Sequence, residues 1–355
     1  VIPVDLSLLN DNDIKAEIEK QSEINSKEGL KIKAVEGDGD ALGTPDGEAQ
    51  DGDSDDGAIK VDPIPTLIKD SKVESIRKKF ATYYSRLLFF AFLTNSKVSS
   101  VQDILIAIDT NEDNARIAKN LEVSKRILEL FRLKMNPFIL SKLDYKIQNL
   151  NTLANDASLA PLNRAITALR KFGRLSESEI VTPSNVADDM VSILPEKDIT
   201  GDTKIFDIAS KQGEFATALY KRFGEKVKPN IYSATTSNVA YEFTRKIYDI
   251  LRMPVNNIFD KFNTYDIIET QNESIIKKLK DMKFDVIVGN PPYQENNGGG
   301  VGTSGQSIYD DFVGCAKVLA PQYINMIIPS RWLTVVGGKL STFRTLMIDD
   351  NKIKF

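Results

Sequence analysis

The chain has 355 residues, 41% of them hydrophobic, which is enough for two domains and a sizeable core. It contains no histidine and a single cysteine, Cys315, which excludes histidine-dependent triads, HExxH zinc sites and a disulfide framework, and we expect no bound metal. No apolar run reaches membrane-spanning length and no signal-peptide pattern opens the chain, so we expect a cytoplasmic protein without a membrane partner.

An acidic, glycine-rich segment covers residues 36–57. It holds nine Asp or Glu, six Gly and no Lys or Arg. Such a segment cannot bury enough apolar surface to offset its ordering entropy, so it is predicted to be a disordered linker within an N-terminal region, residues 1–65. Without those nine acids the chain has 41 acidic and 46 basic residues, and this balance of +5 suits a polyanionic partner without requiring one.

Residues 66–178 are predicted to form a helical domain. Residues 73–93, 115–135 and 161–173 place apolar side chains at helical spacing and are separated by short polar breaks. Phe89, Phe90 and Phe92 are interpreted as core rather than as a stacking platform for bases.

After residue 178 the hydrophobic period changes. Four short runs rich in Ile, Val, Phe and Tyr are predicted to be strands, at residues 204–209, 230–236, 284–289 and 323–329. Helical stretches separate or follow them, at residues 214–223, 238–251, 270–281 and 308–319. This alternation predicts an α/β fold for residues 179–355, with a mostly parallel sheet covered by helices on both faces. Ligands of such sheets bind beyond the carboxyl ends of the strands.

The third predicted strand runs directly into Asn290-Pro291-Pro292-Tyr293. The prolines hold the backbone extended, so the turn presents the Asn290 amide and the free carbonyls of Asn290 and Pro291 beside the Tyr293 ring. Acceptors next to a flat ring suit an exocyclic amino group on a planar base. Binding of the amino hydrogens exposes the nitrogen lone pair to an electrophilic methyl group, with no need for a histidine base. A proline-stiffened strand end without a catalytic role is the plainer alternative.

These four residues resemble the catalytic motif of amino-group methyltransferases, above all the DNA adenine-N6 methyltransferases of restriction-modification systems. Three further stretches resemble that family in the same order: residues 179–195, residues 205–215, which resemble its Asp-Pro-x-x-Gly-x-Gly motif, and residues 323–333 with the helix that follows. The motif order resembles the gamma arrangement of type I and type IIG enzymes. The resemblance implies a Rossmann-like, S-adenosylmethionine-dependent methyltransferase core over residues 179–355.

The same resemblance implies the cofactor-binding residues, which are Thr182, Pro183, Asp207, Ala209, Gly213, Phe215, Thr235 and Asp266. A glycine at position 213 lets the loop pass close to the cofactor at a helix N-terminus. The chain also departs from the family pattern. Ile208, Lys211 and Gln212 replace the usual Pro, Gly and Ser, and the second strand ends in Thr235 and Thr236 without the acid that usually binds the ribose hydroxyls.

Two other segments lie near the expected site. Residues 300–307 resemble a P-loop, but Gln306 replaces its lysine and no strand leads into it, so we interpret the glycine-rich stretch 296–307 as a mobile lid. Arg331 follows the fourth strand, where a contact to DNA phosphate and a brace for the catalytic loop are both open. The neighbouring Trp332 is either packing or part of the site.

The resulting hypothesis is site-specific methyl transfer from S-adenosylmethionine to the N6 of a flipped adenine in double-stranded DNA, with base flipping costing a few kcal/mol. Two alternatives stay open: an amino-group methyltransferase acting on release-factor glutamine or RNA, and a catalytically degenerate scaffold that binds DNA. Because the chain does not begin with Met and stops at "NKIKF", we expect a piece of a longer polypeptide with a target-recognition domain and, upstream, a nuclease or helicase as candidates.

Overall fold

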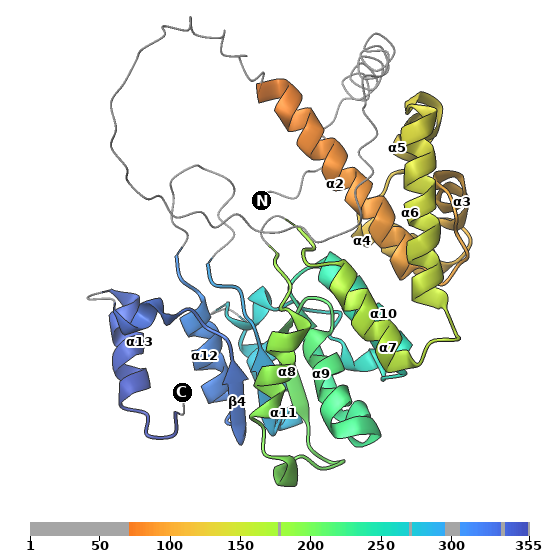
Figure 1. Ribbon diagram of the computed structural model, residues 1–355. Coiled ribbons are helices and arrows are strands. Elements are labelled where there is room, and N and C mark those ends of the chain that lie inside the picture. The colour runs from red at the N-terminus through yellow and green to blue at the C-terminus, as the bar shows by residue number, and fades with distance from the viewer. Residues whose placement is uncertain (1–70, 177–178, 270–271, 295–305, 335–337, 354–355) are drawn as a thin grey trace, which may run out of the picture.

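The computed structural model describes residues 71–176, 179–269, 272–294, 306–334 and 338–353 (Figure 1). The predicted N-terminal region with its linker at 36–57, and the predicted lid apart from its last two residues, lie outside the described residues. Within them, a group of helices is followed by a sheet with helices around it. None of the helices in the described ranges is both long enough and apolar enough to cross a membrane.

The helical region consists of α2 (Ser71–Leu93), α3 (Val101–Ala107), α4 (Glu112–Asn120), α5 (Lys125–Lys134), α6 (Pro137–Asn155) and α7 (Pro161–Lys171). The helices expected at 73–93 and 161–173 are α2 and α7. The stretch 115–135 is divided between α4 and α5, because Glu122 adopts a left-handed conformation with φ of 53°. That turn lets Leu121 and Val123 on either side of it enter the core.

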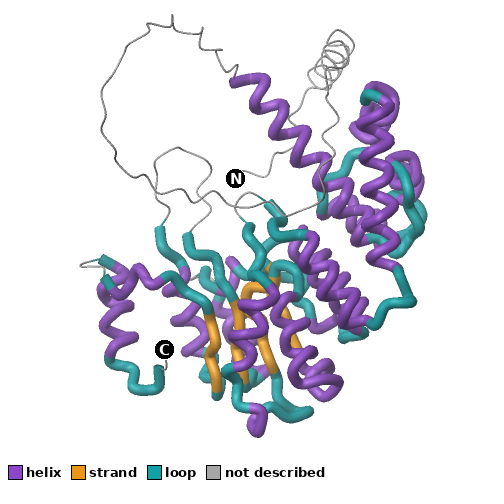
Figure 2. The backbone as a smooth tube through the Cα atoms, viewed as in Figure 1, coloured by secondary structure: helices purple, strands orange, loops and turns teal. Residues whose placement is uncertain are grey.

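The sheet contains four parallel strands, β1 (Ile205–Ser210), β2 (Ile231–Thr235), β3 (Val286–Gly289) and β4 (Tyr323–Met326), which lie side by side (Figure 2). Their spatial order is β2-β1-β3-β4. All four predicted strands are confirmed, although β4 ends at Met326 rather than at residue 329. The chain leaves β1 toward β2 on one side and returns to place β3 on the other side of β1. The order therefore reverses between β1 and β3, and such reversal points are where open α/β sheets bind ligands.

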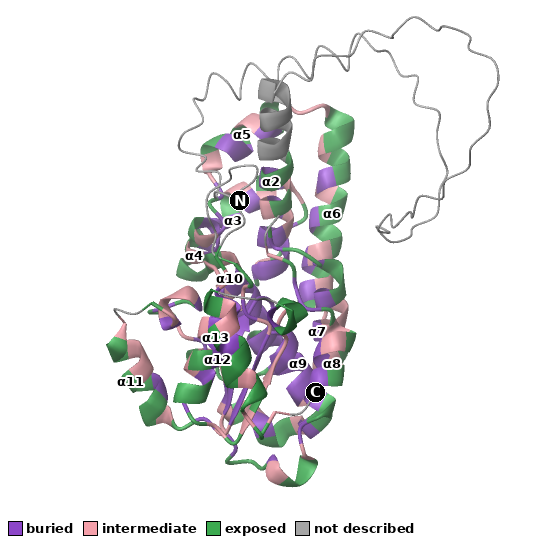
Figure 3. Ribbon diagram, turned by 90° about the vertical axis from the view of Figure 1, so that its left-hand side faces the viewer, coloured by how far each residue is buried: buried purple, intermediate pink, exposed green. Residues whose placement is uncertain are grey.

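Helices cover both faces of this sheet: α8 (Ser184–Ser192), α9 (Glu214–Phe223), α10 (Asn238–Leu251), α11 (Glu273–Met282) and α12 (Tyr309–Val318), with α13 (Lys339–Ile348) beside them. Alternate strand residues belong to different cores, as strand geometry requires. Ile205, Val286 and Val288 pack with α8, α9 and α10, whereas Phe206, Ile208 and Ile287 pack with α11 and α12. In the view coloured by burial, β1, β2 and β3 lie buried between the helical layers, whereas the edge strand β4 is partly exposed (Figure 3).

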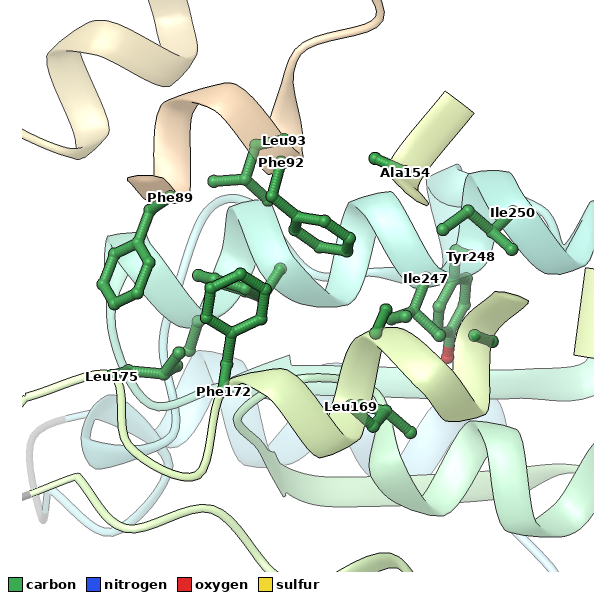
Figure 4. Close-up of a cluster of buried hydrophobic side chains, with 14 of the residues drawn as sticks. Phe89, Phe92, Leu93, Ala154, Leu169, Phe172, Leu175, Ile247, Tyr248 and Ile250 are labelled. Atoms are coloured by element: carbon green, nitrogen blue, oxygen red, sulfur yellow. The ribbon is translucent and has the colours of Figure 1, made fainter. Parts of the chain in front are cut away.

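The helical region shares its hydrophobic core with the sheet region. Phe89 and Phe92 of α2 and Phe172 after α7 lie over α10, where Phe92 and Phe172 each approach the Phe243 ring with centroids 5.6 and 5.1 Å apart (Figure 4). The interpretation of Phe89 and its neighbours as core is confirmed, since Phe90 and Phe92 are fully buried. The division of the chain at residues 178 and 179 stays a prediction, because side chains from both sides of it form one continuous cluster.

Polar contacts accompany this packing. Arg116 of α4 donates from Nε to Glu242 of α10 at 2.9 Å, and Asn120 donates to the same carboxylate oxygen at 2.6 Å. Glu242 is buried, and the charge of Arg116 together with the Asn120 hydrogen bond offsets the cost of removing its carboxylate from water.

Candidate active site

The carboxyl ends of β1 and β3 meet with almost no space between them. A Cβ atom added at Gly289, the last residue of β3, would lie 2.9 Å from Cγ2 of Ile208 in β1. A side chain at this position would force the two strands apart. Glycine therefore allows Asn290 to lie directly beside the loop that follows β1.

Asn290 is held through both its side chain and its backbone. Its Nδ2 donates to Oγ1 of Thr182 at 3.1 Å, and its carbonyl oxygen accepts from Nζ of Lys211 at 3.2 Å. The prediction that the Asn290 carbonyl is a free acceptor is therefore wrong, because a lysine that the sequence analysis treated only as a departure occupies it. The side-chain oxygen Oδ1 is buried and has no hydrogen-bond partner among the residues that the structure describes.

The rest of the Asn-Pro-Pro-Tyr turn runs from the interior to the surface. Pro291 is buried and Pro292 is half-buried, while Tyr293 is 41% exposed. The Tyr293 ring meets Tyr309 of α12 edge to face, with centroids 6.5 Å apart, and partial burial raises the pKa of its phenol. The turn is thus neither sealed in the core nor free in solvent, and it ends in a partly accessible aromatic face.

A buried carboxyl group lies within β1, just before the loop that follows this strand. Asp207 is fully buried and its Oδ1 accepts from the backbone N–H of Ala209 at 3.2 Å, while its Oδ2 has no partner in the described part of the chain. Burial and the nearby Glu214 raise the pKa of Asp207 well above its ordinary value. Gly213 then begins α9 with φ of 74°, a left-handed conformation that glycine adopts without strain.

Two residues that sequence reasoning did not select complete this loop. Gln212 donates from its backbone to Oε2 of Glu214 at 2.8 Å and from Nε2 to the Phe172 carbonyl at 2.5 Å. Both side chains are buried, and each has one oxygen, Oε1, without a partner among the described residues. Together with one oxygen each of Asp207 and Asn290, four buried oxygens in and beside this loop have no donor within the described ranges. Glu214 was recognisable only as an acid in the first turn of a helix that opens at a glycine.

A carboxylate also lies at the end of β2, although the strand itself supplies none. Glu179 accepts from the hydroxyls of Thr236 and Ser237, the latter at 3.0 Å. Burial raises the pKa of Glu179. An antiparallel bridge between Arg174 and Ile180 holds the segment that carries it. No sequence signal links Glu179 to β2, because the contact spans 57 residues of chain.

The other predicted cofactor residues lie in different surroundings. Thr235 is buried at the end of β2. Asp266 lies in the 3-10 helix Tyr265–Ile267 and accepts from the backbone N–H of Asn263 at 2.7 Å, which is a local contact. Pro183 is exposed at the start of α8, and Phe215 of α9 is fully buried in the core.

Arg331 and Trp332 lie in a short 3-10 helix, Ser330–Leu333, beyond β4. Arg331 is exposed. Trp332 is buried and meets Phe343 of α13 with ring centroids 5.7 Å apart, so the packing interpretation of Trp332 is confirmed.

Comparison with known proteins adds to this geometry. The profile of the Eco57I restriction-modification methylase family matches residues 105–355. An uncharacterized adenine-specific methylase of Mycoplasma pneumoniae is 42% identical over 105 residues, which are 28% of this chain and 25% of that protein. The chain thus matches about a quarter of the length of that curated relative.

Two solved structures are similar at low identity. A type I restriction-modification methyltransferase subunit from Streptococcus thermophilus matches with a TM-score of 0.44 and 14% identity, over 79% of this chain and 64% of that one. A chain of the DrdV–DNA complex matches with a TM-score of 0.38 and 16% identity, over 74% of this chain and 34% of that one.

Proposed function

Because the chain belongs to the Eco57I restriction-modification methylase family, we propose that it transfers a methyl group from S-adenosylmethionine to the N6 amino group of adenine in double-stranded DNA. The observation that carries this proposal is the Asn290 side chain, which has its nitrogen bound to Thr182 and its Oδ1 buried without a partner among the described residues. A buried acceptor without a donor costs about 1–3 kcal/mol, and an amino hydrogen of a bound substrate would remove that penalty.

The residues around the β1 loop fit S-adenosylmethionine. This cofactor has an ammonium group and a sulfonium centre, and both suit a site rich in acceptors. Asp207, Gln212 and Glu214 each have one buried oxygen there that no described residue contacts by a hydrogen bond. Gly213 has no Cβ, and one added at its position would already lie 3.1 Å from Ile247. The cofactor would supply the electrophilic methyl group.

The departures from the family pattern are compatible with this fit. Lys211 and Gln212 stand where the family has small residues. Their side chains donate hydrogen bonds to the Asn290 and Phe172 carbonyls and so connect this loop to other segments of the protein. We assign the ammonium end to Asp207 and Glu214. We assign the ribose hydroxyls to Glu179, whose carboxylate lies beside the Thr236 hydroxyl at the end of β2.

The turn after β3 would bind the substrate base. Oδ1 of Asn290 and the carbonyl of Pro291 accept the two N6 hydrogens, and Tyr293 stacks on the ring of an adenine extruded from the duplex. An amine bound in this way needs no histidine to remove its proton before attack. The adenine specificity in the name of the Mycoplasma relative agrees with this choice of base.

The same proposal includes a DNA contact, the extent of the catalytic unit and the cellular compartment. We assign a DNA phosphate contact to the exposed Arg331 and the catalytic unit to residues 179–355, with the helical region in front of it. The parent polypeptide would act in the cytoplasm and carry target recognition in further domains.

The parent protein incubated with tritium-labelled S-adenosylmethionine tests the proposal, with unmethylated plasmid DNA, total RNA and release factor as separate acceptors. We expect label in DNA as N6-methyladenine. Asn290→Ala should lower the rate by about 100-fold or more, since it removes a polar group that binds the reacting atom. The same variant should still bind S-adenosylhomocysteine in calorimetry.

Other outcomes would support the alternatives. Label in release factor or RNA but not in DNA would mean that the methyl group is transferred to that substrate and not to adenine in DNA. Absence of S-adenosylhomocysteine uptake by the wild-type protein would favour a scaffold without catalysis. The unpartnered acceptors of the β1 loop argue against such a scaffold, because a site without a ligand would gain stability from losing them.

A further inference from the structure

Thr182 contacts the proposed catalytic turn directly. It is 3% exposed and lies just before α8, and its Oγ1 accepts the only hydrogen bond that Nδ2 of Asn290 makes within the described residues. The two residues are 108 positions apart in the chain. The threonine therefore brings a segment that precedes the sheet to the side chain at the end of β3.

The backbone around Asn290 is already fixed by other groups. Ile327 donates to the Gly289 carbonyl at 3.1 Å, and Lys211 donates to the Asn290 carbonyl at 3.2 Å. The freedom that remains is rotation of the amide about its side-chain torsions, and the terminal torsion of asparagine is intrinsically broad. Thr182 restricts that rotation.

Thr182 itself is held firmly in relation to the sheet. The neighbouring Val181 donates to the Gly173 carbonyl at 3.2 Å, and α8 starts immediately after Pro183. Asn325 of β4 in turn donates to the Met190 carbonyl of α8 at 2.7 Å. The hydroxyl thus belongs to a rigid frame and can orient a more mobile partner.

We propose that Thr182 is a positioning residue for the methyl acceptor. By accepting from Nδ2 it turns Oδ1 of Asn290 toward the incoming amino group, so that the site presents an acceptor and selects substrates that donate hydrogens. This inference rests on the proposed function, and it gives Thr182 a role through Asn290 in place of the cofactor contact that the family resemblance implied.

Two substitutions at this position separate the role of the hydroxyl from that of the side-chain volume. Thr182→Val keeps the shape and removes the acceptor, whereas Thr182→Ser keeps the hydroxyl. In the parent protein with unmethylated plasmid DNA, Thr182→Val should lower kcat by about tenfold to a hundredfold, the range expected when a reacting group is misplaced. Thr182→Ser should stay within about threefold of wild type, and calorimetry should give all three proteins the same affinity for S-adenosylhomocysteine.

A double substitution keeps the test independent of folding effects. Asn290→Ala removes the amide that Thr182 anchors, so in that background the further change Thr182→Val should have much less effect on kcat than it has beside asparagine. Equal losses in both backgrounds would overturn the proposal, as would equal losses for the Val and Ser variants. Weaker S-adenosylhomocysteine binding at unchanged kcat would make Thr182 a cofactor ligand instead. If the wild-type protein transferred no methyl group to DNA, the proposed function would fail first.

Discussion

Lys246 provides a quantitative test of how the helical region joins the sheet region. It lies on α10, is 5% exposed, and donates from Nζ to Oδ1 of Asn95 at 2.5 Å and Oδ1 of Asn155 at 3.2 Å. Burial lowers the pKa of Lys246 to about 8, and Arg164 acts in the same direction, while Asp249 opposes the shift. The ordinary pKa of this group is 10.5.

The direction of the pH effect follows from the two pKa values of Lys246. Between pH 8 and 10.5 the unfolded chain binds a proton that the folded chain has released, so the free energy of unfolding rises with pH. The full difference, at about 1.4 kcal/mol per pKa unit, is about 3 kcal/mol. Between about pH 7.5 and pH 9.5 the contribution of Lys246 should increase by about 2 kcal/mol.

Urea unfolding followed by circular dichroism at several pH values measures this contribution. Lys246→Met keeps an unbranched side chain of similar length and removes the titrating amino group. The free energy of unfolding of wild type should therefore rise by about 2 kcal/mol relative to this variant over that pH range. The same substitution at the exposed Lys277 of α11 controls for loss of a lysine. The reasoning would be refuted if the difference in free energy of unfolding between wild type and Lys246→Met stayed constant with pH. It would also be refuted if wild type lost stability relative to this variant as the pH rises.

Two further predictions concern the cofactor side of the site. Gly213→Ala should destabilise the protein by about 1–3 kcal/mol in thermal or urea unfolding, from left-handed strain plus the 3.1 Å approach to Ile247, and an unchanged free energy of unfolding would contradict both causes. Glu179→Gln should weaken S-adenosylhomocysteine binding about tenfold, the value of one charge-assisted hydrogen bond, and leave a 2′,3′-dideoxy analogue unaffected. A matching loss with the analogue would assign the effect to local folding.

Local signals in the sequence predicted much of the fold. The predicted helices at 214–223 and 238–251 coincide with α9 and α10, because Gly213 and the Ser237 cap mark their starts. The convergence of Asp207 and Asn290 was predictable as well, since carboxyl ends of parallel strands share one edge. The break at Glu122 was not, because its left-handed conformation has no residue-type signature.

The missing parts of the site depend on contacts that are distant in sequence. Glu179 reaches the end of β2 across 57 residues, and Thr182 reaches Asn290 across 108. Lys211 stands where the family has a glycine, and its amino group donates to the Asn290 carbonyl in the proposed catalytic turn. A side chain that replaces a glycine can thus add a contact, and only the path of the neighbouring strand reveals which one.

The close contact between Gly289 and Ile208 fixes the spacing of β1 and β3. With 2.9 Å available for a Cβ atom, β1 and β3 are already in van der Waals contact and cannot slide closer or accept a spacer. The distance between a ligand bound at the carboxyl end of β1 and a second ligand bound at the carboxyl end of β3 is therefore fixed by this contact. Related enzymes that accommodate substrates of other sizes would have to differ in the segments beyond the strand ends, after Tyr293. The contact between Gly289 and Ile208 would stay unchanged.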